Sequence, residues 1–165
     1  MSDQCQHCGG EGLLDNIGLC PICGVCGHSV EVDRDGGKLC FGCGRMRYVA
    51  RIDRKILSRN ELDKMHWSKR HREREQWAVA IRFEGFGGRV PQADGPMKIN
   101  ILSNRSRKLD YDNLVGGCKP ILDALKKLGA IVDDKPGMVD VTYSQQGASE
   151  IGTIIEMITD TIHGE

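Results

Sequence analysis

Acidic side chains stand at both ends of one short segment, LDYDNLVGGCKPILDALKKLGAIVDD, which spans residues 109–134. At its start, Asp110 and Asp112 lie two positions apart, and in an extended chain such positions point to the same side. Two neighbouring carboxylates repel each other unless a cation lies between them. Because hard divalent cations such as Mg²⁺ or Mn²⁺ prefer oxygen ligands, the pair predicts a divalent-cation site.

The middle of this segment predicts a helix that would bring its two acidic ends together. Four apolar residues have the spacing of one helical face, and Gly129 is a natural C-cap. These apolar residues are Ile121, Leu122, Leu125 and Leu128. The helix can turn the chain back and return Asp133 or Asp134 to the first pair. Another interpretation stays open, in which Asp112 and Asn113 cap a helix and the second acidic pair forms a surface turn.

Basic residues accompany the acids. Residues 45–82 contain twelve Lys and Arg against five Asp and Glu, whereas residues 130–165 contain one against seven, although the formal net charge is zero. A chain polarised in this way can present a basic face to a polyanion, or the charges can form an ordinary solvated surface. Acids that hold a cation beside bases that bind phosphate fit a phosphodiester-cleaving site. The basic residues predicted to contact nucleic acid are Lys69, Arg70, Arg72, Arg74, Arg105 and Arg107.

The first part of the chain predicts a zinc-binding module. Seven of the eight cysteines lie in the first 43 residues, in overlapping CxxC pairs. Two thiolates at this spacing can bind one Zn²⁺ from a tight turn, and two such turns complete a tetrahedral site. The segment has few large apolar residues, so we expect metal binding to stabilise it. The predicted structural zinc ligands are Cys5, Cys8, Cys20, Cys23, Cys26, Cys40 and Cys43.

Two pairings of these cysteines remain open. In the first, Cys23, Cys26, Cys40 and Cys43 form a zinc ribbon, with residues 29–39 as a hairpin that turns at Asp35-Gly36-Gly37. The three remaining cysteines would then bind a second zinc with His7 or His28. In the other, the four ligands of one zinc are Cys5, Cys8, Cys20 and Cys23, and the last three cysteines act with a histidine. One or two zinc ions are therefore expected.

After residue 45 the pattern changes to that of a globular domain. Residues 46–52 alternate as a strand, Leu62–Phe83 suggest a helix with Met65, Trp77, Ala78 and Ile81 inside, and Met97, Ile99 and Ile101 mark a second strand. The predicted helix over residues 121–128 and two strands, over 137–146 and 151–162, follow. This order predicts an α+β fold, with two helices packed on one mixed β-sheet. The predicted domains are the Cys-rich module (1–45) and the α+β domain (46–165).

The acidic segment resembles the core signature of the RusA family of Holliday junction resolvases, which is common in phages and prophages. The shared features are D-x-D-N-L from Asp110, a lysine ahead of Asp-Ala-Leu, and a glycine followed shortly by Asp-Asp. The stretch SRNELDKMHWSKR also resembles the amino-terminal part of phage-type members. The resemblance covers roughly residues 48–158 and leaves the Cys-rich module outside it.

The resemblance implies a role for individual residues. Asp110 and Asp112 match the paired acids that bind the catalytic metal, and Asp134 matches the third acid, with Asp133 as its substitute. Lys119 matches the functional lysine of the family, because it lies four residues before the Asp-Ala-Leu aspartate.

The chain also departs from the family pattern. In the shortest family members the lysine follows the asparagine by three positions, where this chain has Gly116. The residues GGC therefore form an insertion before Lys119, and the two glycines would let the chain loop or kink so that the lysine reaches the site. Cys118, inside the insertion, is expected to be a small buried side chain.

The implied activity is metal-dependent endonucleolytic cleavage of four-way junctions and related branched DNA in recombination and repair. One or two Mg²⁺ or Mn²⁺ ions would activate water and bind the scissile phosphate, while Lys119 neutralises developing charge. A homodimer is implied, because a four-way junction has two-fold symmetry. An alternative of a different class is a non-catalytic zinc-ribbon protein that binds nucleic acid.

The surroundings of the protein can be predicted as well. No apolar run approaches the roughly 20 residues that span a bilayer. The start of the sequence lacks a basic region followed by a hydrophobic stretch, so no secretory signal is expected. We therefore expect a cytoplasmic protein without membrane contacts. In that compartment closely spaced cysteines bind metal more often than they form disulfides. The family resemblance implies a bacterial host and a phage or prophage origin.

Overall fold

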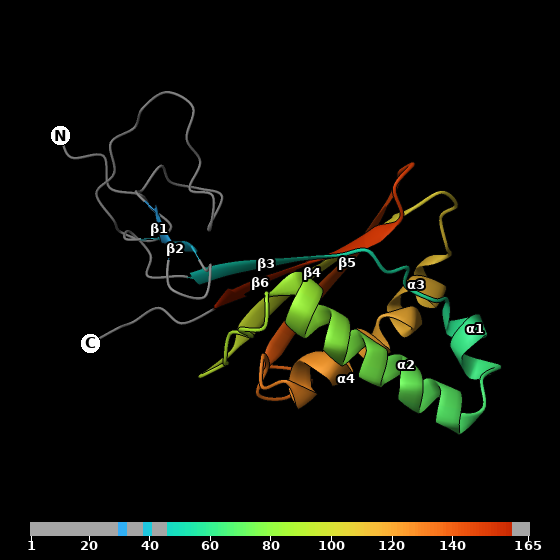
Figure 1. Ribbon diagram of the computed structural model, residues 1–165, viewed down its shortest axis with the longest axis horizontal. Coiled ribbons are helices and arrows are strands. Elements are labelled where there is room, and N and C mark those ends of the chain that lie inside the picture. The colour runs from blue at the N-terminus through green and yellow to red at the C-terminus, as the bar shows by residue number, and fades with distance from the viewer. Residues whose placement is uncertain (1–29, 33–37, 41–45, 160–165) are drawn as a thin grey trace.

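The computed structural model describes residues 30–32, 38–40 and 46–159, and its centre is one mixed β-sheet (Figure 1). The sheet order is β1-β2-β3-β6-β4-β5. Strand β4 pairs in parallel with β5 and antiparallel with β6, and β6 pairs antiparallel with β3. The strands are β1 (Val30–Val32), β2 (Lys38–Cys40), β3 (Met46–Ile52), β4 (Met97–Arg105), β5 (Val139–Gly147) and β6 (Gly152–Thr159).

Helices α2 and α4 pack against each other over one face of this sheet, which confirms the predicted α+β class (Figure 1). The helices are α1 (Arg59–Asp63), α2 (Trp67–Ala80), α3 (Tyr111–Gly117) and α4 (Lys119–Lys127), and a π-helical turn, η1 (Ile81–Gly85), extends α2. Helices α3 and α4 form the crossover between the parallel strands β4 and β5. This connection places the first acidic pair, Asp110 and Asp112, at the start of α3, and the second pair, Asp133 and Asp134, after α4.

The alternating strand patterns are confirmed. On β3, Ala50 and Ile52 are buried, whereas Val49 and Arg51 are exposed. The predicted inward residues of β4 are buried as well, and β4 continues two residues beyond the predicted strand end at Ser103, to Arg105. Because side chains alternate along a strand, this extension carries Arg105 to the same buried face.

The predicted helix from the acidic segment is also confirmed. Ile121, Leu122 and Leu125 of α4 are buried in the core. Gly129 has a φ of +75°, and the amide of Ala130 donates to the carbonyl of Leu125 at 2.9 Å, as in a Schellman motif. Helix α4 therefore ends sharply, and the chain turns toward the second acidic pair.

The prediction of one continuous helix over 62–83 is wrong, because the helix is interrupted after Asp63 and both of its ends differ from the predicted ones. Ser58 and Glu61 form a capping box that starts α1 earlier, at Arg59. Helix α1 stops at Asp63, and His66 begins α2 by accepting a hydrogen bond from the amide of Ser68. Of the predicted inner residues, Trp77, Ala78 and Ile81 are buried, and Met65 in the break is half-buried. The final turn is π-helical rather than α-helical.

One acidic residue of α2 belongs to the interior. Glu73 is buried, accepts a hydrogen bond from Arg54 at 2.7 Å, and accepts another from the indole of Trp77 at 3.1 Å. The guanidinium of Arg54 also lies over the Trp77 ring, 5.3 Å from its centroid. These contacts fix α2 to the chain that leaves β3, and they orient the rest of the helix surface.

The predicted hairpin of the Cys-rich module is confirmed in its strands, because β1 and β2 pair antiparallel and β2 pairs with β3. Its turn and the zinc ligands Cys5, Cys8, Cys20, Cys23, Cys26 and Cys43 lie outside the described residues, and of Cys40 the structure describes only its backbone position in β2. Zinc binding therefore stays a prediction. None of the helices in the described ranges is long and apolar enough to cross a bilayer.

Candidate functional site

The first acidic pair lies where the chain enters α3. Asp110 is the N-cap residue, with φ −63° and ψ 150°, and Asp112 follows in the first helical turn. The extended arrangement expected for both is therefore wrong for Asp112. Both side chains are exposed, and neither makes a hydrogen bond or ion pair with another described residue. Since Asp110 occupies the cap position without a side-chain cap bond, capping does not account for either carboxylate.

Gln145 of β5 fixes the chain just before this pair. Its side-chain amide donates to the carbonyl of Leu109 at 2.6 Å, and its oxygen accepts from the amide of Leu109 at 2.9 Å. Two hydrogen bonds to the backbone of one residue, Leu109, restrain both the position and the direction of the chain that leads to Asp110. Sequence reasoning missed Gln145, because the role depends on a tertiary contact between residues 36 positions apart.

Arg105 lies beside Asp110 with part of its guanidinium unsatisfied. Its side chain is 5% exposed, and its Nε donates to the carbonyl of Arg107 at 2.7 Å. Its Nη1 has no hydrogen-bond partner among the described residues. Burial lowers the pKa of Arg105, an effect that the nearby Glu61 opposes. A buried donor without a partner is costly, so an anionic ligand would stabilise it.

Arg105 also lines an open hollow of about 480 Å³. Its lining is mainly basic and polar and includes Lys55, Ser58, Arg105, Ser106, Arg107, Lys108, Asp110 and Asn113. The hollow therefore combines several cations and two hydroxyl groups with two carboxylates, those of Asp110 and of Glu61, which pairs with Lys55 at 3.7 Å. A phosphate group fits such a lining, because ionised donors form the stronger hydrogen bonds to its oxygens.

The structure brings Lys119 and Asp134 together. The Nζ of Lys119 lies 2.5 Å from the Oδ2 of Asp134 and 3.1 Å from the Oδ1 of Asp123. Asp134 raises the pKa of Lys119, and Lys119, followed by Lys126, lowers the pKa of Asp134. Both groups are therefore charged at neutral pH.

The neighbouring Asp133 is held in the same cluster. It forms ion pairs with Lys126 and, at 3.0 Å, with Lys135. Lys126 and then Lys135 lower the pKa of the Asp133 carboxyl. Lysine side chains thus offset the negative charges of both acids of the second pair.

The acids at the two ends of the segment do not form one cluster in this arrangement. Within the described ranges, no three Asp, Glu, His or Cys side chains converge as a metal centre. The chemistry of Asp110 and Asp112 fits a hard divalent cation, because both are exposed carboxylates without partners. Asp134 would join them only by exchanging a lysine for the cation. A three-acid magnesium site therefore stays a prediction.

The two glycines of the insertion have a different role from the one expected. Both belong to α3, and they allow this helix to approach the chain before α1. A Cβ on Gly117 would lie 2.0 Å from the backbone oxygen of Leu57, and one on Gly116 would lie 2.7 Å from the side chain of Arg59. Gly117 therefore sets the position of α3, and with it that of the acids at its start.

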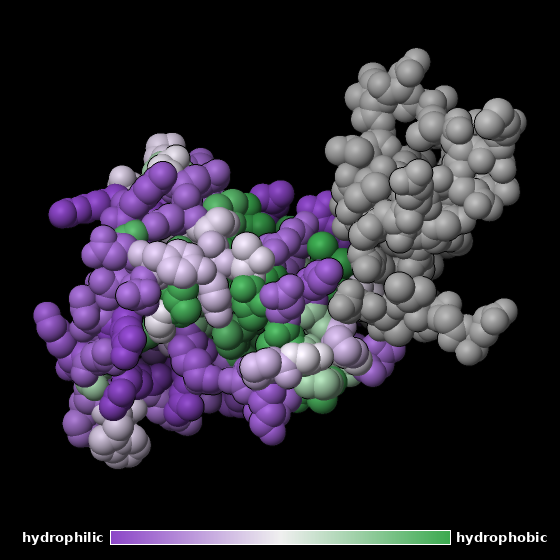
Figure 2. Space-filling model, turned by 180° about the vertical axis from the view of Figure 1, so that it is seen from behind, coloured by the Kyte–Doolittle hydropathy of each residue, from purple (hydrophilic) through white to green (hydrophobic). Residues whose placement is uncertain are grey.

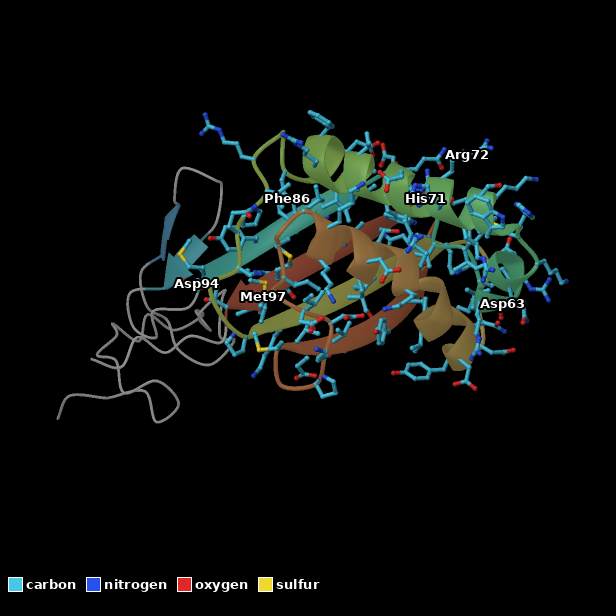
Figure 3. The ribbon with its side chains drawn as sticks, turned by 90° about the horizontal axis from the view of Figure 1, so that it is seen from below. Asp63, His71, Arg72, Phe86, Asp94 and Met97 are labelled. Carbon is cyan, nitrogen blue, oxygen red and sulfur yellow. The ribbon has the colours of Figure 1, made fainter. Side chains whose placement is uncertain are left out.

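Helix α2 presents the predicted basic side chains to solvent. Lys69, Arg70 and Arg72 are exposed and make no ion pair with a described residue, and Figure 3 shows Arg72 extending away from the helix. Arg74 is exposed and lies 3.9 Å from Asp123. Arg107 is exposed as well, so Arg105 differs from the other predicted basic contacts in being buried.

Cys118 is buried at the junction of α3 and α4, as expected. It is a free thiol with no exposed surface, and burial raises its pKa to about 12. A thiol held in this protonated state is neither a nucleophile nor a metal ligand at neutral pH.

Comparison of the chain with protein-family models gives no match, and comparison with curated proteins gives none either.

Proposed function

We propose that the chain is a metal-dependent endodeoxyribonuclease that cleaves four-way junctions and related branched DNA. The observation that carries this proposal is Arg105, which is buried, has an Nη1 without a partner among the described residues, and lines a basic hollow together with Asp110. A buried cationic donor of this kind favours a phosphate at that position. A phosphate there lies beside Asp110, one of the two carboxylates that have no partner among the described residues.

The residues have distinct tasks in this proposal. Arg105 binds a backbone phosphate, and Gln145 holds the peptide before Asp110 so that the acid keeps its place. Asp110 and Asp112, joined by Asp134, are the residues that would hold Mg²⁺ or Mn²⁺, which when bound supplies Lewis acidity and a more acidic water. Lys119 offsets the negative charge that develops on the phosphate. The exposed bases of α2 bind flanking DNA by its phosphates, without reading its sequence.

The direct experiment uses the full protein, a synthetic four-way junction and a linear duplex of the same sequence. The proposal expects cleavage of the junction with Mg²⁺, little cleavage of the duplex, and none of either with EDTA. Failure to cut the junction with both Mg²⁺ and Mn²⁺ would remove the nuclease proposal.

A homodimer is part of the same proposal, because two opposed strands of a junction must be cut. The face of the sheet away from the helices supports it. Apolar residues gather near the middle of this face among polar ones (Figure 2), and Val49, Leu102 and Ile154 line a shallow hollow there. Exposed apolar patches with polar rims are typical of interaction surfaces. Sedimentation of a Leu102→Glu variant as a monomer, with the wild type as a dimer, would assign the surface.

The alternative is a non-catalytic zinc-ribbon protein that binds nucleic acid. One observation favours it: Asp133 and Asp134 are neutralised by lysines, and within the described residues no third acid joins Asp110 and Asp112. It expects junction binding without cleavage under every metal condition. Action on DNA inside a bacterial cell also underlies our proposal of a cytoplasmic protein of phage or prophage origin, with structural zinc in the Cys-rich module.

A further inference from the structure

A second hollow lies between the helices and is larger than the hollow at Arg105. Its volume is about 850 Å³, and its walls come from α1, the start of α2, α3 and the start of α4. Figure 3 shows His71 on α2 and Asp63 on α1, both of which line it. Lys119 and Asp123 lie at its edge, so this groove, which we call the α1–α4 groove, adjoins the predicted site.

The floor of the α1–α4 groove is apolar, and a tryptophan stands at its side. Leu62, Val115, Pro120 and Leu122 contribute to the lining. Trp67, in the first turn of α2, is 69% exposed, whereas Trp77 of the same helix is 1% exposed. The Trp67 ring makes a tilted contact with His66, with 5.5 Å between the ring centroids. Most of the indole therefore contributes nothing to the core and remains available to a ligand.

The rim of the groove is basic. Four cationic side chains line it, Arg59, Arg70, Arg74 and Lys119, against the two carboxylates of Asp63 and Asp123. The carboxylates are already shared, because Asp63 pairs with Arg59 at 3.5 Å and Asp123 pairs with Lys119 and Arg74.

Arg70 has no partner among the described residues, and it lines the groove together with Trp67. Surface ion pairs are worth about 0–1 kcal/mol, so a phosphate can displace the carboxylates from the other arginines at little cost. The groove thus offers one free guanidinium and two weakly held ones to an anionic ligand.

We propose that the α1–α4 groove binds an unpaired nucleotide of a DNA strand. The base stacks on Trp67 above the apolar floor, and the adjoining phosphates contact Arg70 and Arg74. An aromatic ring combined with a basic rim is the pattern by which proteins bind single strands, since every base has a stacking face. An acidic peptide would use the rim and leave the indole and the floor without a partner. A base-paired strand is excluded from stacking because its faces are already covered.

This inference rests on the proposed function and extends it to the choice of substrate. Because the groove adjoins Lys119, a strand held there would pass the acidic segment with one or more bases unpaired. Branched DNA with unpaired nucleotides beside the crossover would then be bound more tightly than a fully paired junction of the same length.

The test measures binding without cleavage, in EDTA. A short oligothymidylate is titrated into the full protein while tryptophan fluorescence is followed, because a base stacked on Trp67 quenches its emission and Trp77 is shielded. We expect saturable quenching that is lost in Trp67→Leu. The affinity of this variant, measured by the fluorescence anisotropy of a labelled oligothymidylate, should be lower by about 5- to 150-fold, which corresponds to ~1–3 kcal/mol per stacked base. Phe83→Leu is the matched control, an aromatic that is 61% exposed on η1 and does not line the groove.

Two further measurements, on the Arg70→Ala variant and with heparin, distinguish base stacking from binding by charge alone. Arg70→Ala should weaken oligothymidylate binding and lower the salt slope by roughly one, because one phosphate contact is lost. Heparin carries negative charge without bases and should not quench Trp67. Equal affinity of Trp67→Leu and wild type for oligothymidylate would overturn the inference, as would equal quenching by heparin. Because no metal is present, absence of junction cleavage in the earlier experiment would leave this result unaffected.

Discussion

Replacing Gly117 with alanine tests how α3 is positioned. The new Cβ would lie 2.0 Å from the backbone oxygen of Leu57 and 3.2 Å from the Cγ2 of Ile56. Ordinary contacts begin near 3.4 Å, so α3 and the chain before α1 must separate. A carbonyl oxygen has no rotamer by which to move aside, so we take the upper end of the overpacking cost, about 3 kcal/mol.

Alanine is also the better helix former, by up to about 1 kcal/mol, which leaves a net loss of about 2 kcal/mol in the free energy of unfolding. In a chain of 165 residues this corresponds to a fall in Tm of about 4–8 °C. Thermal unfolding followed by the fluorescence of the buried Trp77 measures it. Displacement of α3 by about 1 Å should also lower junction cleavage by about 10²-fold.

Two other glycine-to-alanine variants serve as controls for the effect of Gly117→Ala on Tm. A Cβ on Gly147 meets nothing within 4 Å, so Gly147→Ala should leave Tm unchanged. A Cβ on Gly116 would lie 2.7 Å from the Cβ of Arg59, which rotation of the side chain does not move, so Gly116→Ala should also lower Tm. The loss should be smaller than for Gly117→Ala, whose closest contact is a backbone oxygen at 2.0 Å. A Gly117→Ala variant as stable as Gly147→Ala would refute the close packing of α3 against Leu57.

Three other predictions concern different parts of the chain. Alanine at Lys69, Arg70 and Arg72 together should weaken junction binding and reduce its salt slope by up to about three; an unchanged slope means that α2 faces away from DNA. Cys118 should resist iodoacetamide at pH 8 in the native protein and react after denaturation, as peptide mapping by mass spectrometry would show; rapid native labelling contradicts its burial. Elemental analysis should find one or two zinc ions, whose removal unfolds residues 1–44 alone; protein purified without chelators that contains no zinc would exclude the module.

Local patterns in the sequence were sufficient for much of the fold. Alternation predicted the buried faces of β3 and β4, and helical spacing together with Gly129 predicted α4 and its end. These features depend on residues close together in the chain. The capping box of Ser58 and Glu61 was not predicted, and the long run of helix-forming residues after it concealed the break before His66.

Features that depend on distant residues were not predictable in this way. Strand β4 lies between β5 and β6, although the latter two are consecutive in the chain. Glu73 appeared to be one of the few acids on a basic surface, but Arg54 and Trp77 bind it in the interior. Gly117 gives no sign in the sequence that the carbonyl of Leu57 approaches it.

In the candidate site, too, some residues could be identified from local sequence and others only from tertiary contacts. Asp110 and Asp112 were identified from residue type and spacing, whereas Lys119 and the choice of Asp134 came from the family resemblance; the structure pairs these last two residues. The buried state of Arg105 follows from the extension of β4, which places it on the inner face of the strand. Gln145 and Trp67 act through tertiary contacts or exposure, which neither spacing nor composition conveys.

The measurement that tests the account most directly is junction cleavage by Asp112→Asn in Mg²⁺, with a gel shift on the same junction. Asparagine keeps the size of the side chain and can stand in a first helical turn, but it lacks the charge that a hard cation requires. The account predicts a loss of cleavage by orders of magnitude with junction binding preserved or tightened, and Asp134→Asn should behave likewise. Loss with Asp112→Asn alone would keep the nuclease and move the third ligand to Asp133 or another acid. Near-normal cleavage by Asp112→Asn would contradict the nuclease assignment.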